Sequence, residues 1–144
     1  VGRVSEQKAL AVPRENGDVV IAADTIVVCE GKVLGKPRSE EEAKEMLRLL
    51  SGRDHQVMTG CTVLAGEKRE TFVEVTDLHF RELSEKEIER YVATKEPMDK
   101  AGAYGIQGLG RVLVEGIRGD YETVVGLPAA RVYRALREHD VVAR

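Results

Sequence analysis

An aspartate inside a long apolar run is the first candidate for chemistry. Asp24 interrupts the segment Val19–Val28 (VVIAADTIVV), and Thr25 follows it with a hydroxyl on the opposite face of an extended chain. Burying an unpaired carboxylate would cost several kcal/mol as an order of magnitude. A bend in the strand, a structural hydrogen-bond network or an active site would each account for Asp24, and its immediate neighbours leave all three open.

A lysine in a restricted turn is the second candidate. In Leu34–Pro37 (LGKP), Gly35 permits a close approach to the backbone, and Pro37 restricts Lys36 to an extended geometry. The Lys36 ammonium would then point in a fixed direction, the alternative being a solvated lysine in a turn. Residues 31–36 lack the GxxxxGK spacing and the following Ser or Thr of a P-loop, which excludes that motif.

A glycine-rich segment, Met98–Gly108 (MDKAGAYGIQG), is the third candidate. Four glycines between positions 102 and 110 would let the backbone turn tightly around a ligand. Gln107 offers an amide with both an acceptor and donors, which suits the edge of a base. The spacing does not match GxGxxG and no strand leads directly into the segment, which argues against a Rossmann cofactor site. A flexible surface loop is the alternative.

The elements that must position these candidates alternate along the chain. Ser39 with Glu42, and Ser84 with Glu87, form capping-box patterns that begin two helices. Strands are predicted over 19–28, 33–34, 55–65, 70–80 and 111–116, helices over 4–12, 39–50, 84–94 and 128–139, and a shaped loop over 95–110. This mixture predicts an α/β fold and a single domain covering residues 1–144.

Composition and charge exclude several classes of protein. The chain has 144 residues, of which 42% are hydrophobic, too many for a disordered protein. Its net charge of −3 argues against a nonspecific nucleic-acid binder or membrane-surface binder, whose affinity depends on clustered positive charge. No apolar run reaches the roughly 18 residues of a membrane span, and the first residues lack a signal-peptide core.

The cysteines and histidines give no sign of a metal centre. Cys29 and Cys61 lie in strand-like apolar runs without a partner at ligand spacing, and both are expected to be buried free thiols. Free thiols make the cytoplasm the simplest expected location. His55, His79 and His139 are scattered among turn or charged residues, and each is expected to be solvated.

In series, these segments resemble the Maf family of nucleoside triphosphate pyrophosphatases, which has a Maf/HAM1-like (inosine triphosphate pyrophosphatase-like) fold. The resemblance implies a mixed twisted sheet flanked by helices. The DKAGAYGIQG loop together with ADT and GKP is highly specific, and it looks like the branch associated with dTTP and UTP rather than 7-methyl-GTP. The matching stretches, in the family's order, are Glu6–Ala9, Ala23–Thr25, Leu34–Pro37, Leu50–Gly52, His55–Gly60, Asp99–Gly108 and Val124–Pro128.

The resemblance implies cleavage between the α and β phosphates of dTTP, UTP and modified pyrimidine nucleotides, giving a monophosphate and pyrophosphate. Asp24 would be the proton acceptor that orients or deprotonates water, in contact with a divalent cation (Mg or Mn) whose other ligands stay unknown. Lys8 and Lys36 would offset charge on the phosphates. Thr25 and Gln107 match positions tied to substrate selection. The expected partner is the nucleotide, with no nucleic acid or membrane, and the resemblance also implies a homodimer.

The N-terminal segment departs from the family. Val1–Lys8 has no match to the family's SxSPRR-type loop, whose serine and arginines hold phosphates, and Met98 replaces an aromatic residue often found there. We therefore expect an N-terminally truncated domain with a core strand absent and an incomplete phosphate site. Such a chain would be less stable than its length suggests, and weak or inactive on its own.

Two alternatives to this enzyme are considered. The chain could be a non-catalytic module that binds nucleotide or a partner in septum formation, which the departure at the N-terminus favours. It could also be a HAM1-like pyrophosphatase acting on inosine and xanthosine triphosphates. The GAYGIQG sequence of the loop argues against this second alternative.

Overall fold

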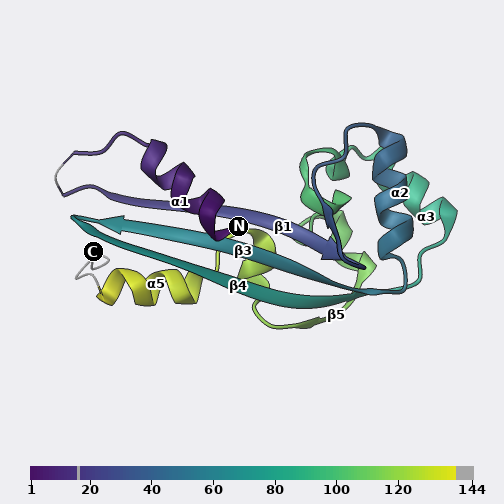
Figure 1. Ribbon diagram of the computed structural model, residues 1–144. Coiled ribbons are helices and arrows are strands. Elements are labelled where there is room, and N and C mark those ends of the chain that lie inside the picture. Colours follow the sequence, from purple (N-terminus) through teal and green to yellow (C-terminus); the bar gives the residue numbers. More distant parts are fainter. Residues whose placement is uncertain (16, 139–144) are drawn as a thin grey trace.

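The computed structural model describes residues 1–15 and 17–138, which form a long twisted sheet with helices around it (Figure 1). Three short 3-10 helices cover Glu96–Asp99, Ala101–Ala103 and Leu109–Leu113. The helices are α1 (Gly2–Ala11), α2 (Glu40–Leu50), α3 (Glu85–Ala93), α4 (Tyr121–Val125) and α5 (Ala129–Glu138), and the strands are β1 (Val19–Cys29), β2 (Lys32–Leu34), β3 (Asp54–Ala65), β4 (Lys68–Phe80) and β5 (Val114–Arg118).

The sheet has the strand order β2-β1-β3-β4-β5. The predicted α/β class is confirmed, but every strand pair in the described part of the chain is antiparallel, whereas a mixed sheet was expected. Short turns account for two of the pairs, β1–β2 and β3–β4. Glu30 and Gly31 join β1 to β2 with positive φ angles of 52° and 75°, and Gly66 in the β3–β4 turn has a φ of 62°. Turns this tight can only join antiparallel neighbours.

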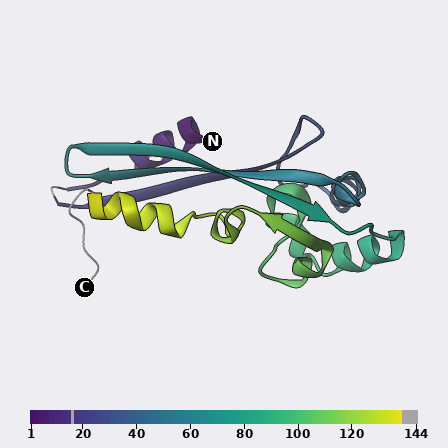
Figure 2. The ribbon, with the colours of Figure 1, turned by 90° about the horizontal axis from the view of Figure 1, so that it is seen from below.

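Helices α1 and α5 cover opposite faces of the long strands (Figure 2). On one face, Ala9 of α1 packs with Val20 of β1 and Leu64 of β3. On the other, a cluster of buried residues joins α5 to β3 and β4: Cys61, Val63, Phe72, Val132 and Ala135. Because neighbouring residues of a strand face opposite ways, Val63 and Leu64 belong to different layers.

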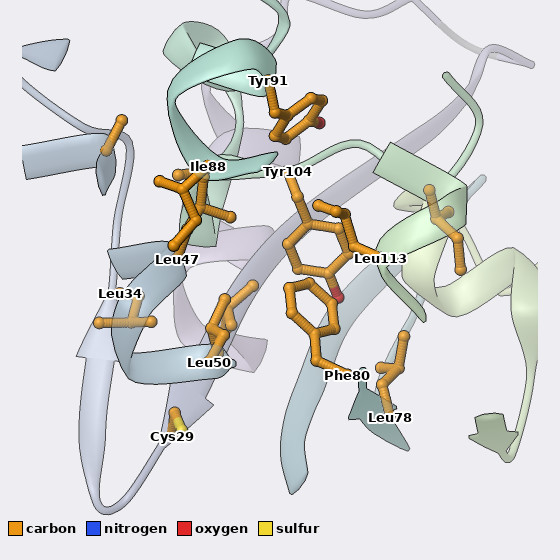
Figure 3. Packing of buried hydrophobic residues seen from close by; sticks show 14 of the residues in the cluster. Cys29, Leu34, Leu47, Leu50, Leu78, Phe80, Ile88, Tyr91, Tyr104 and Leu113 are labelled. Carbon is orange, nitrogen blue, oxygen red and sulfur yellow. The ribbon is translucent and has the colours of Figure 1, made fainter. Parts of the chain in front are cut away.

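The largest core lies at the other end of the molecule, where α2 and α3 pack beside the ends of the strands (Figure 1). Its aromatic centre is formed by Phe80 and Tyr104, whose ring centroids are 4.7 Å apart in an edge-to-face arrangement (Figure 3). His55 joins them, with its ring 4.9 Å from that of Phe80. The glycine-rich segment that contains Tyr104 is thus anchored in the core.

The serine caps predicted for two helices are present. Ser84 and Glu87 form the complete reciprocal capping box of α3, whereas Ser39 accepts a hydrogen bond from the Glu42 backbone N–H at the start of α2. Each cap satisfies backbone donors that have no partner inside the helix. No helix among residues 1–15 and 17–138 is long and apolar enough to cross a membrane.

Three details of the sequence prediction were wrong. The strand expected over 111–116 begins at Val114 instead, because the residues before it form a 3-10 helix. Helix α4 was not predicted, since its five residues are too few to show a helical period. Tyr133, expected on the inward side of the last helix, is 55% exposed. The expected end of that helix at His139 lies outside the described residues.

Candidate active site

A single cavity of about 550 Å³ is lined by all five of the residues singled out by the sequence. These residues are Lys8, Asp24, Thr25, Lys36 and Gln107. They come from α1, β1, the segment after β2 and the glycine-rich loop, so only the fold brings them together. A cavity of this size is in the range of small-molecule sites, about 300–1,000 Å³. The roles that the resemblance implies for these residues stay predictions.

Asp24 forms an ion pair with Lys8, and this pair accounts for a carboxylate in an apolar strand. The Lys8 Nζ lies 3.4 Å from Asp24 Oδ1 and donates to the Ala23 carbonyl at 3.1 Å. The Asp24 side chain is 21% exposed and that of Lys8 is 53% exposed, so both reach solvent at the cavity. The carboxylate is therefore paired and accessible.

A seam of hydrogen-bonded polar side chains holds helix α1 in the position that places Lys8 at the cavity. Ser5 Oγ and Thr62 Oγ1 are 2.8 Å apart, and both residues are fully buried. Thr62 continues the chain of hydrogen bonds to Thr71, which donates to Glu6 Oε1 at 2.9 Å. A seam of directional bonds fixes the helix more precisely than apolar contact alone.

Lys36 is directed into the cavity by the segment that follows β2. The Gly35 carbonyl accepts a hydrogen bond from Gly102 N at 3.1 Å, which ties this segment to the glycine-rich loop. Pro37 is buried, whereas Lys36 is exposed, and no hydrogen bond or ion pair to its ammonium is found within the described residues. The backbone beside Lys36 is thus tied to the loop, whereas the fixed direction expected for its ammonium stays a prediction.

Gln107 lies at the tip of a loop whose flanking side chains are anchored. Tyr104 and Ile106 are buried in the core, and Gln107 between the loop's glycines is exposed. The Tyr104 hydroxyl lies 2.7 Å from His55 Nε2. His55 was expected to be solvated, and that prediction was wrong: it is 2% exposed. Its flanking polar residues belong to a strand, where a polar neighbour faces the opposite side.

The Glu96 carboxylate acts as a brace for the same loop, because it accepts hydrogen bonds from backbone amides of the loop. Its Oε1 accepts a hydrogen bond from Leu109 N at 2.9 Å, and its Oε2 accepts from Gly110 N at 3.0 Å and from Tyr91 Oη at 2.5 Å. Burial would raise the pKa of the Glu96 carboxyl. The bonds from Tyr91 and the two amides, with the nearby Lys100 charge, lower that pKa below its ordinary value. Glu96 thus accepts these bonds as a carboxylate.

This brace explains two of the loop's glycines. A Cβ on Gly108 would collide with the Glu96 carboxylate, and one on Gly110 would collide with Gly105 O and Tyr91 Oη. These glycines were expected to let the backbone turn tightly around a ligand. Gly108 and Gly110 instead make room for the loop's own hydrogen bonds.

Several further residues of the site were not found by sequence reasoning. Glu96, Asp99 and Lys100 also line the cavity, and Lys100 Nζ lies 3.3 Å from Asp99 Oδ1. Asp99 and Lys100 could have been found from the sequence, because they are the two charged residues that open the DKAG stretch. Thr59 of β3 is paired with Thr25 of β1, and their hydroxyl oxygens are 2.9 Å apart. Nothing in the sequence indicated this pairing, because it depends on the register of β1 against β3.

The carboxylates of the cavity fit a cation that is shared with phosphates. Within residues 1–15 and 17–138, no group of three or more His, Cys, Asp or Glu side chains converges on one point. Mg²⁺ is usually bound by one or two carboxylates together with substrate phosphates rather than by an all-protein cage. Asp24 offers one accessible carboxylate at the cavity. Asp24 and a bound polyphosphate together would supply such ligands.

Comparison with known proteins identifies the family of this chain. The family model described as "Maf-like protein" matches residues 1–139. A "dTTP/UTP pyrophosphatase" of Bacillus cereus (strain B4264) is 57% identical over 136 residues, which are 94% of this chain and 71% of that protein. A protein of the same name from Bacillus thuringiensis subsp. konkukian (strain 97-27) is 54% identical over the same shares of the two chains. This chain belongs to the Maf family.

Proposed function

We propose that this protein hydrolyses the α–β phosphoanhydride bond of dTTP, UTP and modified pyrimidine nucleotides to the monophosphate and pyrophosphate. The observation that carries the proposal is one cavity that combines an accessible carboxylate, Asp24, with the ammonium groups of Lys8, Lys36 and Lys100 and the amide of Gln107. The name of the relatives that are 54–57% identical supports the substrate.

The residues of the cavity have different tasks in the proposed reaction. Asp24 accepts a proton from a water molecule, whose oxygen bonds to phosphorus while the bridging P–O bond breaks. Lys8 and Lys36 offset the charge that develops on the phosphate oxygens, a task of positioning and electrostatics. Asp24 would hold a divalent cation (Mg²⁺ or Mn²⁺) together with the substrate phosphates, and the cation would add charge neutralisation at those oxygens.

Gln107 is the residue we propose to read the base. Uracil and thymine present an N3–H flanked by carbonyl oxygens, and an oriented amide can meet this edge with one acceptor and one donor. The anchored residues on both sides of Gln107 hold the turn that would keep this orientation. A mismatched polar group costs about 1–3 kcal/mol, which corresponds to roughly tenfold to hundredfold discrimination.

A substrate panel with the protein expressed from its complete reading frame tests this proposal. dTTP and UTP should release pyrophosphate faster than CTP, ITP, XTP or 7-methyl-GTP. Gln107→Glu should lower kcat/KM for dTTP and UTP about tenfold or more, because a carboxylate cannot donate to a carbonyl. Gln107→Asn, which keeps the amide on a shorter stem, is the matched control. An unchanged preference in Gln107→Glu would remove this residue from base reading.

We also place the protein in the cytoplasm. A nucleoside triphosphate substrate and two free, buried thiols, Cys29 and Cys61, support this location, because thiols persist in reducing compartments.

A further inference from the structure

We propose that Thr59, a buried residue of β3 paired with Thr25 of β1, fixes the direction of hydrogen bonding at Thr25, so that Thr25 presents only acceptor lone pairs to the nucleotide cavity. Thr59 is then a positioning residue for substrate selection. The identity of the ligand as a nucleotide rests on the proposed function, whereas the direction of the bond follows from the geometry alone.

The direction follows from counting protons along a chain of three groups. Thr59 Oγ1 lies 2.9 Å from the Thr123 carbonyl oxygen and 2.9 Å from Thr25 Oγ1. A carbonyl can only accept, so the single hydroxyl proton of Thr59 is donated to Thr123. The proton between the two hydroxyl groups must therefore come from Thr25. The Thr25 hydroxyl has no second proton to offer a ligand.

The Thr123 end of this series of hydrogen bonds is fixed by further hydrogen bonds. Thr123 N and Thr123 Oγ1 both donate to Asp120 Oδ2, at 3.1 and 2.8 Å. Asp120 is tied in turn to Thr76 of β4, whose hydroxyl accepts from Asp120 N and donates to Asp120 O. Thr59, Thr76 and Thr123 are all fully buried. No water is needed in this chain, because each hydroxyl already has its partners.

Reversing the chain would be unfavourable. If Thr25 kept its proton for a ligand, Thr59 would have to donate to Thr25. Lone pairs of Thr59 Oγ1 and of the Thr123 carbonyl would then face each other at 2.9 Å. Gly126 N also donates to this carbonyl, so the carbonyl keeps one partner in either arrangement. The repulsion at short range inside a buried site nevertheless favours donation from Thr25 to Thr59.

The ligand group that meets Thr25 must therefore be a hydrogen-bond donor. Thr25 lines the cavity, and Gly126 beside it carries no side chain that would cover the hydroxyl. Thr25 lies on the opposite face of β1 from Asp24, the residue proposed to act at the phosphates. The base N3–H of a pyrimidine nucleoside is the donor proposed above to meet Gln107, so the donors left for Thr25 are the sugar O–H groups. These share one chemistry, and an experiment separates them.

The test measures binding of non-hydrolysable α,β-methylene nucleotides by titration calorimetry. The series comprises the UTP analogue and its 2′-deoxy and 3′-deoxy forms, each of which lacks one sugar donor. In the wild-type protein one deletion should weaken binding about tenfold, the effect of losing a hydrogen bond worth about 1.4 kcal/mol. That deletion identifies the donor that meets Thr25.

The variants then separate a directional role of Thr59 from a structural one. Thr59→Val removes the hydroxyl and keeps the shape, which frees the Thr25 proton, so the penalty for the critical deletion should fall below about threefold. Thr59→Ser should restore about tenfold. Ser51→Ala, which removes a hydroxyl that accepts from Leu83 N and does not line the cavity, should leave the penalty unchanged.

Two results would overturn the inference. One is a wild-type protein in which no donor deletion weakens binding more than about threefold. This result does not depend on any variant folding. The other is a folded Thr59→Val protein with the full wild-type penalty. Binding of the analogues without release of pyrophosphate from UTP would contradict the proposed function and leave the direction at Thr25 standing.

Discussion

Buried polar side chains decide how the cavity residues are oriented, and each has a physical cost that the fold compensates. Thr59 is satisfied by Thr25 and Thr123, and Asp24 is paired with Lys8. His55 is the exception, because no hydrogen-bond partner of its Nδ1 is found in the described part of the chain. A buried imidazole of this kind makes the stability of the protein depend on pH.

Acid should destabilise the protein through His55. Burial lowers the pKa of His55 from 6.5 to about 4, with a smaller opposing effect of Asp54 and a smaller lowering by His79. Below pH 6.5 the unfolded chain binds a proton that the folded protein does not, so stability falls as the pH drops from about 6.5 to about 4. The difference corresponds to about 3 kcal/mol as an order of magnitude.

Urea unfolding at several pH values between 7 and 4 measures this effect. His55→Gln keeps a polar group near the Tyr104 hydroxyl. This variant should lose most of the pH dependence, that is, most of the slope of the unfolding free energy against pH between about 6.5 and 4. His79→Gln, at a histidine that is 42% exposed, should keep it. Equal slopes in wild type and His55→Gln would show that other groups cause the acid sensitivity.

At the scale of elements, the glycine-rich loop is held by side chains outside the Gln107 tip. Glu96 binds two of its amides, and Tyr104 anchors it beneath the cavity. Helix α1 plays the same part for Lys8 through the Ser5–Thr62 contact. The cavity residues Lys8 and Gln107 are therefore carried by elements that polar side-chain contacts hold in place.

Glu96→Gln should loosen the loop and weaken substrate binding. An amide has one oxygen where Glu96 uses two, so the N–H of Leu109 or Gly110 loses its acceptor. We expect KM for UTP to rise about tenfold with a smaller change in kcat, and the Leu109 and Gly110 amides to exchange hydrogen faster. Glu85→Gln, at an exposed ion pair with Arg48, is the control. Unchanged exchange of both amides would refute the brace.

At the scale of the whole molecule, the sequence predicted most elements because their signals are local. The capping serines, the apolar period of α2 and the β-favouring run of β1 each depend on neighbours in the chain. Helix α4 and the start of β5 were missed, because short elements are determined by what they pack against.

The sequence predicted which residues belong to the candidate site but not how they are arranged in space. Asp24, Lys36 and Gln107 stood out by type and by their turns, and the cavity brings them together. The roles of Glu96 and Thr59 could not be predicted, because each depends on contacts between segments distant in sequence. Their partners become visible only when the register of β1 on β3 and the path of the loop are known.

The products formed from dTTP by the wild-type protein and by Asp24→Asn test the central claim most directly. With Mg²⁺ present, the wild type should give dTMP and pyrophosphate in equal amounts, without dTDP. Asp24→Asn should lower kcat at least about hundredfold, because an amide cannot accept the proton from water, while it still binds the α,β-methylene analogue. Formation of dTDP and phosphate by the wild type, or full activity in Asp24→Asn, would contradict the account.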